Sequence, residues 1–130
     1  MSESQVSPVI RKKMNPEVKA KWVEALRSGE FTQGKYALRS RWNGEVTFCC
    51  LGVLCEIAVK EEVVKKYNGD RGVLPRDVSS WAGIPRYSNK TPGSSNTVQG
   101  YLANHNDGVP YHGINSLTFG EIADWIEENL

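Results

Sequence analysis

Hydrophobic residues recur at helical spacing close to both ends of the chain. In the N-terminal stretch the recurring residues are Val18, Trp22, Ala25 and Leu26. Asn15 is a favoured N-cap, Pro16 suits the first helical position, and Gly29 is typical of a helix end. The pattern therefore predicts a helix that begins at about Asn15 and ends before Gly29.

The C-terminal stretch predicts a second amphipathic helix. Thr118 and Glu121 have the spacing of a capping box, and Leu117 can pack on Ile122 across the start of the helix. The residues expected on its buried face are Ile122, Trp125 and Ile126.

Between residues 38 and 49 the pattern changes to alternation, which indicates two strands. Asn43-Gly44 is the preferred dipeptide of a type I′ hairpin turn, because both turn positions need a positive φ. Alternation divides the first strand into two faces, with Leu38, Ser40 and Trp42 on one and Arg39 and Arg41 on the other.

Three further segments complete the expected architecture. The continuous apolar run over residues 50–59 predicts a buried central helix, and residues 74–82 predict a short one that ends at Gly83. Residues 98–103 fit a short helix or a strand, whereas 84–97 and 104–115 are rich in turn-forming residues and are expected to be loops. The chain thus predicts an α+β fold, a small antiparallel sheet or β-hairpin packed against three to four helices.

The length suits one domain, which we place over residues 14–130. Residues 1–13 are polar and then basic, so we expect a disordered N-terminal arm, and Met14 is an alternative candidate for the translation start. Sixteen basic and fifteen acidic residues leave a net charge of +1, which argues against a dedicated nucleic-acid-binding domain. No apolar run approaches the roughly 18 residues that cross a membrane, and we expect a cytoplasmic protein.

The three cysteines, Cys49, Cys50 and Cys55, form one cluster. Their spacing matches neither a disulfide framework nor a zinc ribbon. Their apolar neighbours would raise the thiol pKa and so disfavour a nucleophilic thiolate. We therefore expect reduced core cysteines, no metal, no cofactor and no catalytic residue.

Several segments resemble a family of uncharacterised small proteins from bacteriophages and prophages. The resemblance is carried by Met14-Asn15-Pro16-Glu17, Trp22–Gly29, Gln33-Gly34, Phe48-Cys49-Cys50-Leu51-Gly52-Val53-Leu54-Cys55, Val73-Leu74-Pro75, Trp81-Ala82-Gly83, Leu102-Ala103, Asn106-Asp107 and Phe119–Asp124. It covers the chain from Met14 to Leu130 in order. The resemblance implies a bacteriophage setting, and no activity comes with it.

Two groups of residues are candidates for ligand binding. Arg39 and Arg41 share a strand face, with Tyr36 and Trp42 nearby, and arginine forks beside aromatic rings suit phosphates and bases. The alternative is that these cations protect an edge strand from aggregation. The second group comprises the polar stretches Ser94–Thr97 and Asn104–Asp107, in particular Asn104, Asn106 and Asp107, whose alternative role is ordinary turn chemistry.

These features favour a non-enzymatic phage accessory protein that acts by binding in the cytoplasm of the infected bacterium, in host takeover or against host defence. One version sequesters a nucleotide-type immune signal, a small phosphate-bearing ligand. A second version inhibits a host protein. The remaining alternatives are a small hydrolase or thiol enzyme and a weak nucleic-acid regulator that uses the basic arm, and self-association into a homo-oligomer is left open.

Overall fold

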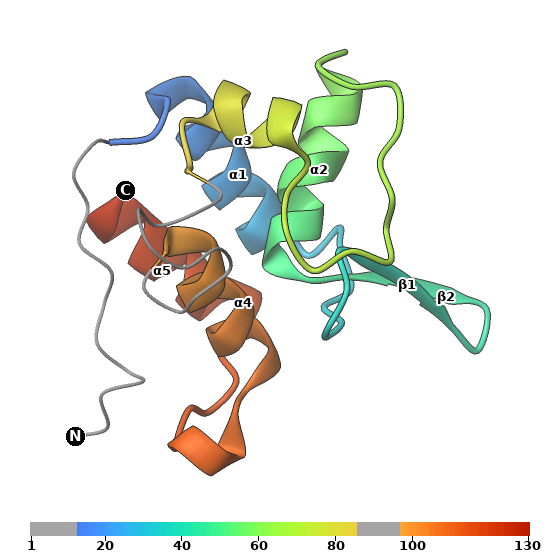
Figure 1. The fold of residues 1–130 in the computed structure, drawn as a ribbon, viewed down its shortest axis with the longest axis vertical. Coiled ribbons are helices and arrows are strands. Elements are labelled where there is room, and N and C mark those ends of the chain that lie inside the picture. Colours follow the sequence, from blue (N-terminus) through green and yellow to red (C-terminus); the bar gives the residue numbers. More distant parts are fainter. Residues whose placement is uncertain (1–12, 86–96) are drawn as a thin grey trace.

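The computed structural model describes residues 13–85 and 97–130. Its elements, in chain order, are α1 (Pro16–Ser28), β1 (Arg39–Trp42), β2 (Glu45–Phe48), α2 (Cys50–Lys60), α3 (Arg76–Ala82), α4 (Val98–Asp107), the 3-10 turn η2 (Pro110–His112) and α5 (Phe119–Asn129). Figure 1 shows α1 between α2 and α5, with the β1–β2 hairpin projecting to one side. The α+β fold is confirmed, and the described residues hold five α-helices rather than three to four.

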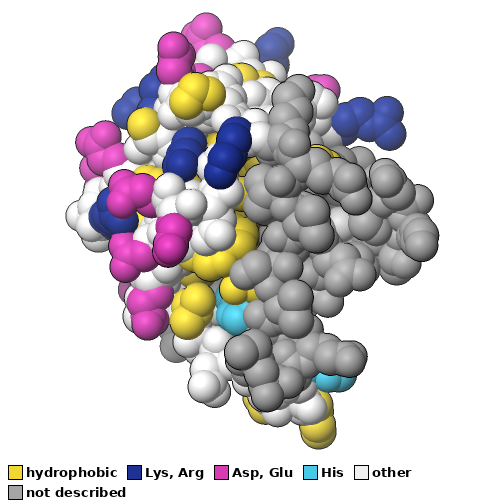
Figure 2. All heavy atoms as spheres, turned by 90° about the vertical axis from the view of Figure 1, so that its left-hand side faces the viewer, with side chains coloured by type: hydrophobic (Ala, Val, Ile, Leu, Met, Phe, Trp, Pro, Cys, Tyr) yellow, Lys and Arg dark blue, Asp and Glu magenta, His cyan; other side chains and the backbone are white. Residues whose placement is uncertain are grey.

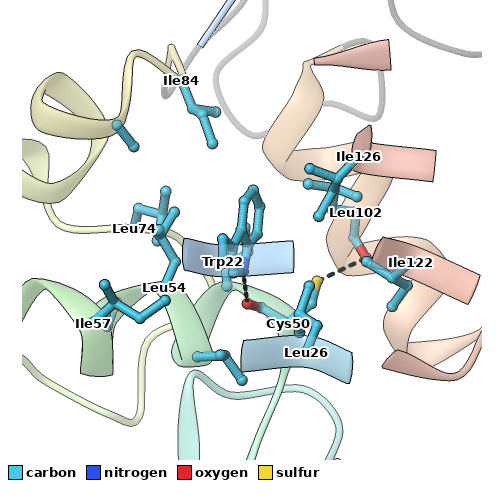
Figure 3. Packing of buried hydrophobic residues seen from close by; sticks show 14 of the residues in the cluster. Trp22, Leu26, Cys50, Leu54, Ile57, Leu74, Ile84, Leu102, Ile122 and Ile126 are labelled. Atoms are coloured by element: carbon cyan, nitrogen blue, oxygen red, sulfur yellow. Dashed lines mark hydrogen bonds between the residues drawn. The ribbon is translucent and has the colours of Figure 1, made fainter. Parts of the chain in front are cut away.

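Helix α2 lies at the centre because it is apolar on nearly every side. Eight of its residues are buried: Cys50, Leu51, Gly52, Val53, Leu54, Cys55, Ile57 and Ala58. Trp22 of α1 is fully buried against it and donates its indole N–H to the carbonyl of Cys50 at 2.9 Å (Figure 3). That bond gives the one polar atom of a large buried side chain a partner, as buried tryptophans require.

Gly52 lets α2 approach the chain that enters the hairpin. A Cβ built on Gly52 would lie 1.7 Å from the carbonyl oxygen of Leu38. The same carbonyl accepts the backbone amide of Cys49 at 3.3 Å. A glycine is therefore needed at this position by the packing of helix on backbone.

The hairpin has the predicted turn. Asn43 and Gly44 have φ of 50° and 80°, as a type I′ turn requires, and Arg41 pairs with Val46. Each strand also meets a loop along its outer edge. The amide of Arg39 donates to Gly69 O at 2.9 Å on one side, and the amide of Phe48 donates to Thr32 O at 2.9 Å on the other.

The sequence interpretation is wrong at residues 104–107, which were expected in a loop and form the last turn of α4. The start of the expected N-terminal arm, residues 1–12, and most of the expected 84–97 loop, residues 86–96, lie outside the described residues. Lys13, the last residue of that arm, donates from Nζ to the carbonyl of Asn129 at 3.2 Å. Across 13–85 and 97–130, no helix combines the length and apolarity needed to cross a membrane.

Candidate functional site

A cleft of about 440 Å³ opens on the face of the hairpin that carries the two strand arginines. We call it the arginine cleft, and its lining residues are Arg39, Ser40, Arg41, Val46, Tyr67, Asn68, Gly69 and Asp70. Arg39 and Arg41 lie on either side of Ser40 in β1, and alternate residues of a strand point to the same face. One strand face therefore supplies both guanidinium groups. The other wall is the loop that follows α2.

Backbone hydrogen bonds hold that loop against β1. Besides the bond from Arg39 to Gly69, the amide of Leu38 donates to Arg71 O at 2.8 Å. A Cβ on Gly69 would lie 3.0 Å from both Cβ and the carbonyl oxygen of Arg39. The loop thus extends the hairpin by a short third segment, and its close approach depends on a residue without a side chain.

Tyr67 connects this wall to the central helix. Its hydroxyl donates to Glu56 Oε2 of α2 at 2.5 Å, and the Arg39 guanidinium lies over its ring, 5.4 Å from the centroid. Burial, and then the hydrogen bond to Glu56, raise the pKa of Tyr67 above its ordinary value. The hydroxyl therefore keeps its proton and remains a donor to Glu56, which fixes the ring beneath Arg39.

The cleft arginines differ from Arg27 of α1 in having no ion-pair partner among the described residues. Across 13–85 and 97–130, neither Arg39 nor Arg41 forms an ion pair, whereas Arg27 pairs with Asp124 at 2.6 Å and with Glu127 at 3.1 Å. The guanidinium N–H groups of the strand arginines are therefore open to an anionic ligand. Figure 2 shows another face, where acidic and basic side chains are interspersed rather than separated by sign.

The two aromatic candidates lie outside the set of residues that line the cleft. Trp42 and Tyr36 are both 73% exposed. Alternation puts Trp42 on the opposite strand face from the arginines, across from Glu45. Tyr36 has a φ of 71°, and its amide donates to the Asp107 carboxylate at 2.9 Å.

The candidates on α4 are a separate group. Asn106 is fully buried, and its amide bonds to protein groups on both sides. Its Oδ1 accepts from Gln33 Nε2 at 3.0 Å and from the amide of Cys50 at 3.1 Å, and its Nδ2 donates to Gly34 O at 2.8 Å. Asp107 accepts from Asn106 and from Tyr36, while Asn104 is partly exposed on the same helix. Asn106 and Asp107 therefore connect α4 to the 33–36 loop, away from the arginine cleft.

Sequence reasoning missed the loop half of the cleft. Residues 67–72 are rich in turn-forming residues, and nothing in their pattern indicates that the backbone of this segment pairs with β1. The usable signal was Tyr67 itself, an aromatic residue inside a polar turn sequence. In the structure its ring lies under the Arg39 guanidinium.

The cysteines lie in the core, as expected. All three are free and buried, and burial raises the pKa of the Cys49 thiol to about 11. Burial also raises the pKa of Cys50 and of Cys55. In the described part of the chain, no group of three or more metal-ligating side chains comes together. Protonated, enclosed thiols are poor nucleophiles and poor ligands.

Residues 14–130 match a family defined by a domain of unknown function, DUF8296, and the chain belongs to that family. No curated protein and no solved structure matches the chain.

Proposed function

We propose that this protein binds a small phosphate-bearing ligand in the arginine cleft and has no catalytic role. The observation that carries the proposal is the placement of Arg39 and Arg41 on one wall of a single cleft, without an ion pair to any described residue. Each charge-assisted hydrogen bond to a phosphate contributes about 1.5–3 kcal/mol. The cleft volume, about 440 Å³, suits a ligand the size of a nucleotide.

The biological setting of this proposal is a bacteriophage accessory protein in the cytoplasm of the infected cell. It rests on the sequence resemblance described above. In that setting, a non-catalytic protein with a phosphate-binding cleft would sequester a nucleotide-type immune signal of the host. Binding without turnover is enough for such a role, and it agrees with buried thiols that stay protonated.

Calorimetric titration with a panel of nucleotides tests the proposal. We expect binding by the wild type and none by the variant that combines Arg39→Ala with Arg41→Ala. Lysine at either position should rescue only part of the affinity, because it lacks the bidentate guanidinium geometry. The matched control is Arg76→Ala, which removes an exposed arginine of α3 outside the cleft. Equal affinities in the wild type and the double variant would refute the cleft as the binding site.

A second function, inhibition of a host protein, is favoured by the exposed aromatic residues. Trp42 and Tyr36 are each 73% exposed, and Tyr111 is 99% exposed. Exposed tryptophan and tyrosine are enriched among residues that dominate the energy of protein interfaces. Cross-linking in infected cells should then give one host partner that is lost in Trp42→Ala and retained in the double arginine variant.

A further inference from the structure

Among the described residues that line the arginine cleft, Asp70 is the one carboxylate. Its position is set by its neighbour, because Asn68 Oδ1 accepts the backbone amide of Asp70 at 3.0 Å. This local bond is an Asx turn, which fixes the backbone of the residue that carries the carboxylate. Among the described residues, no ion pair joins Asp70 to either arginine of the cleft.

A carboxylate in a phosphate-binding cleft has two effects on a ligand. It repels a second anion, so it weakens binding of a bare phosphate or pyrophosphate. It also accepts hydrogen bonds from hydroxyl groups, as acidic residues do with the 2′-hydroxyl of a ribose in dinucleotide-binding sites. A cleft with cations and one carboxylate therefore suits a ligand that has an anionic part and a donor-bearing part.

We infer that the ligand of the arginine cleft is a ribonucleotide, with its phosphates on Arg39 and Arg41 and its ribose hydroxyls donating to Asp70. This inference rests on the proposed function and names the ligand class of that same cleft. Bare pyrophosphate satisfies the arginines and leaves Asp70 facing an anion. A ribonucleoside diphosphate offers phosphates to the arginines and hydroxyl donors to the Asp70 carboxylate. The cleft volume of about 440 Å³ suits one such molecule.

The full-length wild type and Asp70→Asn are titrated calorimetrically with ADP, with 2′-deoxy-ADP and with pyrophosphate. We expect the wild type to bind ADP about tenfold or more tightly than 2′-deoxy-ADP, since a hydrogen bond to a charged group is lost. Asp70→Asn should bind ADP about tenfold more weakly and remove most of that preference. The same substitution should leave pyrophosphate binding unchanged or strengthen it, because the repelling charge is gone.

The outcomes separate this inference from the proposed function. If the wild type binds pyrophosphate and ADP, and Asp70→Asn strengthens both or changes neither, the cleft binds phosphates but Asp70 does not read the ribose. That result overturns the inference alone. If the wild type binds none of the three probes, the proposed function fails and the inference fails with it. Thermal unfolding of Asp70→Asn is the folding control, and we expect a midpoint close to that of the wild type because the side chain is exposed.

Discussion

The side-chain oxygen of Asn106 accepts a hydrogen bond from the backbone amide of Cys50, 56 positions earlier in the chain, at 3.1 Å. Cys50 is the first residue of α2, and its amide is one of the donors that a helix start leaves without an intrahelical partner. Cys49, the N-cap residue, makes no side-chain cap bond. Asn106 on α4 therefore caps the start of α2 from a distant part of the chain, whereas α1 and α5 are each capped by the residue just before them.

The first prediction concerns this distant cap. Asn106→Ala should lower the free energy of unfolding by about 3 kcal/mol, because several buried partners lose their hydrogen bonds together. Asn104→Ala is the matched control on the same helix, where a partly exposed side chain is removed, and it should cost about 0.5 kcal/mol or less. Urea unfolding measures both, and similar losses in the two variants would contradict the role assigned to Asn106.

The second prediction concerns the packing of α2 on the hairpin. Gly52→Ala should be strongly destabilising, by about 3 kcal/mol or more, because the added Cβ would meet the Leu38 carbonyl oxygen at 1.7 Å and the backbone must move. Gly120 of α5 provides the comparison, since the nearest atom to its Cβ position is 3.9 Å away. Gly120→Ala should be neutral or stabilise by up to about 1 kcal/mol, through helix propensity. A tolerated Gly52→Ala would mean that α2 does not lie this close to residue 38.

The third prediction concerns pH. His105 is buried against Tyr101, with ring centroids 4.2 Å apart, and neither ring nitrogen has a hydrogen-bond partner among the described residues. Burial lowers the pKa of His105 below its ordinary value of 6.5. The unfolded chain therefore takes up a proton at a higher pH than the folded one. The stability linked to His105 is complete above about pH 6.5 and is lost as the pH falls through the folded pKa.

Urea unfolding at several pH values checks this sign. The free energy of unfolding of the wild type should decrease from pH 7.5 to pH 5, and His105→Phe should show a smaller decrease, because phenylalanine keeps a ring against Tyr101 without a titrating group. The carboxylates of the chain contribute the same pH dependence to both proteins and cancel in the comparison. Parallel curves for the two proteins would show that His105 is not buried in its neutral form.

The features predicted correctly from the sequence are those with local causes. Asn43-Gly44 determines a hairpin turn by its own φ preferences, and Thr118 with Glu121 forms the expected capping box. The end of α4 was missed because Asn104–Asp107 has weak helix propensity and strong turn propensity. Its helical form is supported by tertiary bonds of Asn106, which no local pattern contains.

The candidate site also has one part that the local sequence predicts and one part that depends on long-range contacts. Strand alternation correctly placed Arg39 and Arg41 on one face, and both line the cleft. The second wall depends on the pairing of Gly69 with Arg39, two residues 30 positions apart. That pairing is a long-range backbone contact, and a turn-rich sequence does not encode where its backbone will bond.

The last prediction concerns Tyr67, which we expect to position Arg39 rather than to bind ligand through its hydroxyl. Tyr67→Phe keeps the ring beneath the guanidinium and removes the hydrogen bond to Glu56 Oε2, so it should cost about 1–2 kcal/mol of stability and weaken ADP binding only a few-fold. Tyr67→Leu also removes the ring, and we expect ADP affinity to fall further, by about another threefold or more, since a cation–π contact of about 0.5–1 kcal/mol is lost and Arg39 gains freedom. Glu56→Gln separates charge from geometry, because the amide oxygen can still accept from the Tyr67 hydroxyl, and its ADP affinity should stay near that of the wild type. Calorimetry on the three variants decides the matter: if Tyr67→Leu binds ADP as tightly as the wild type, the ring has no part in positioning Arg39.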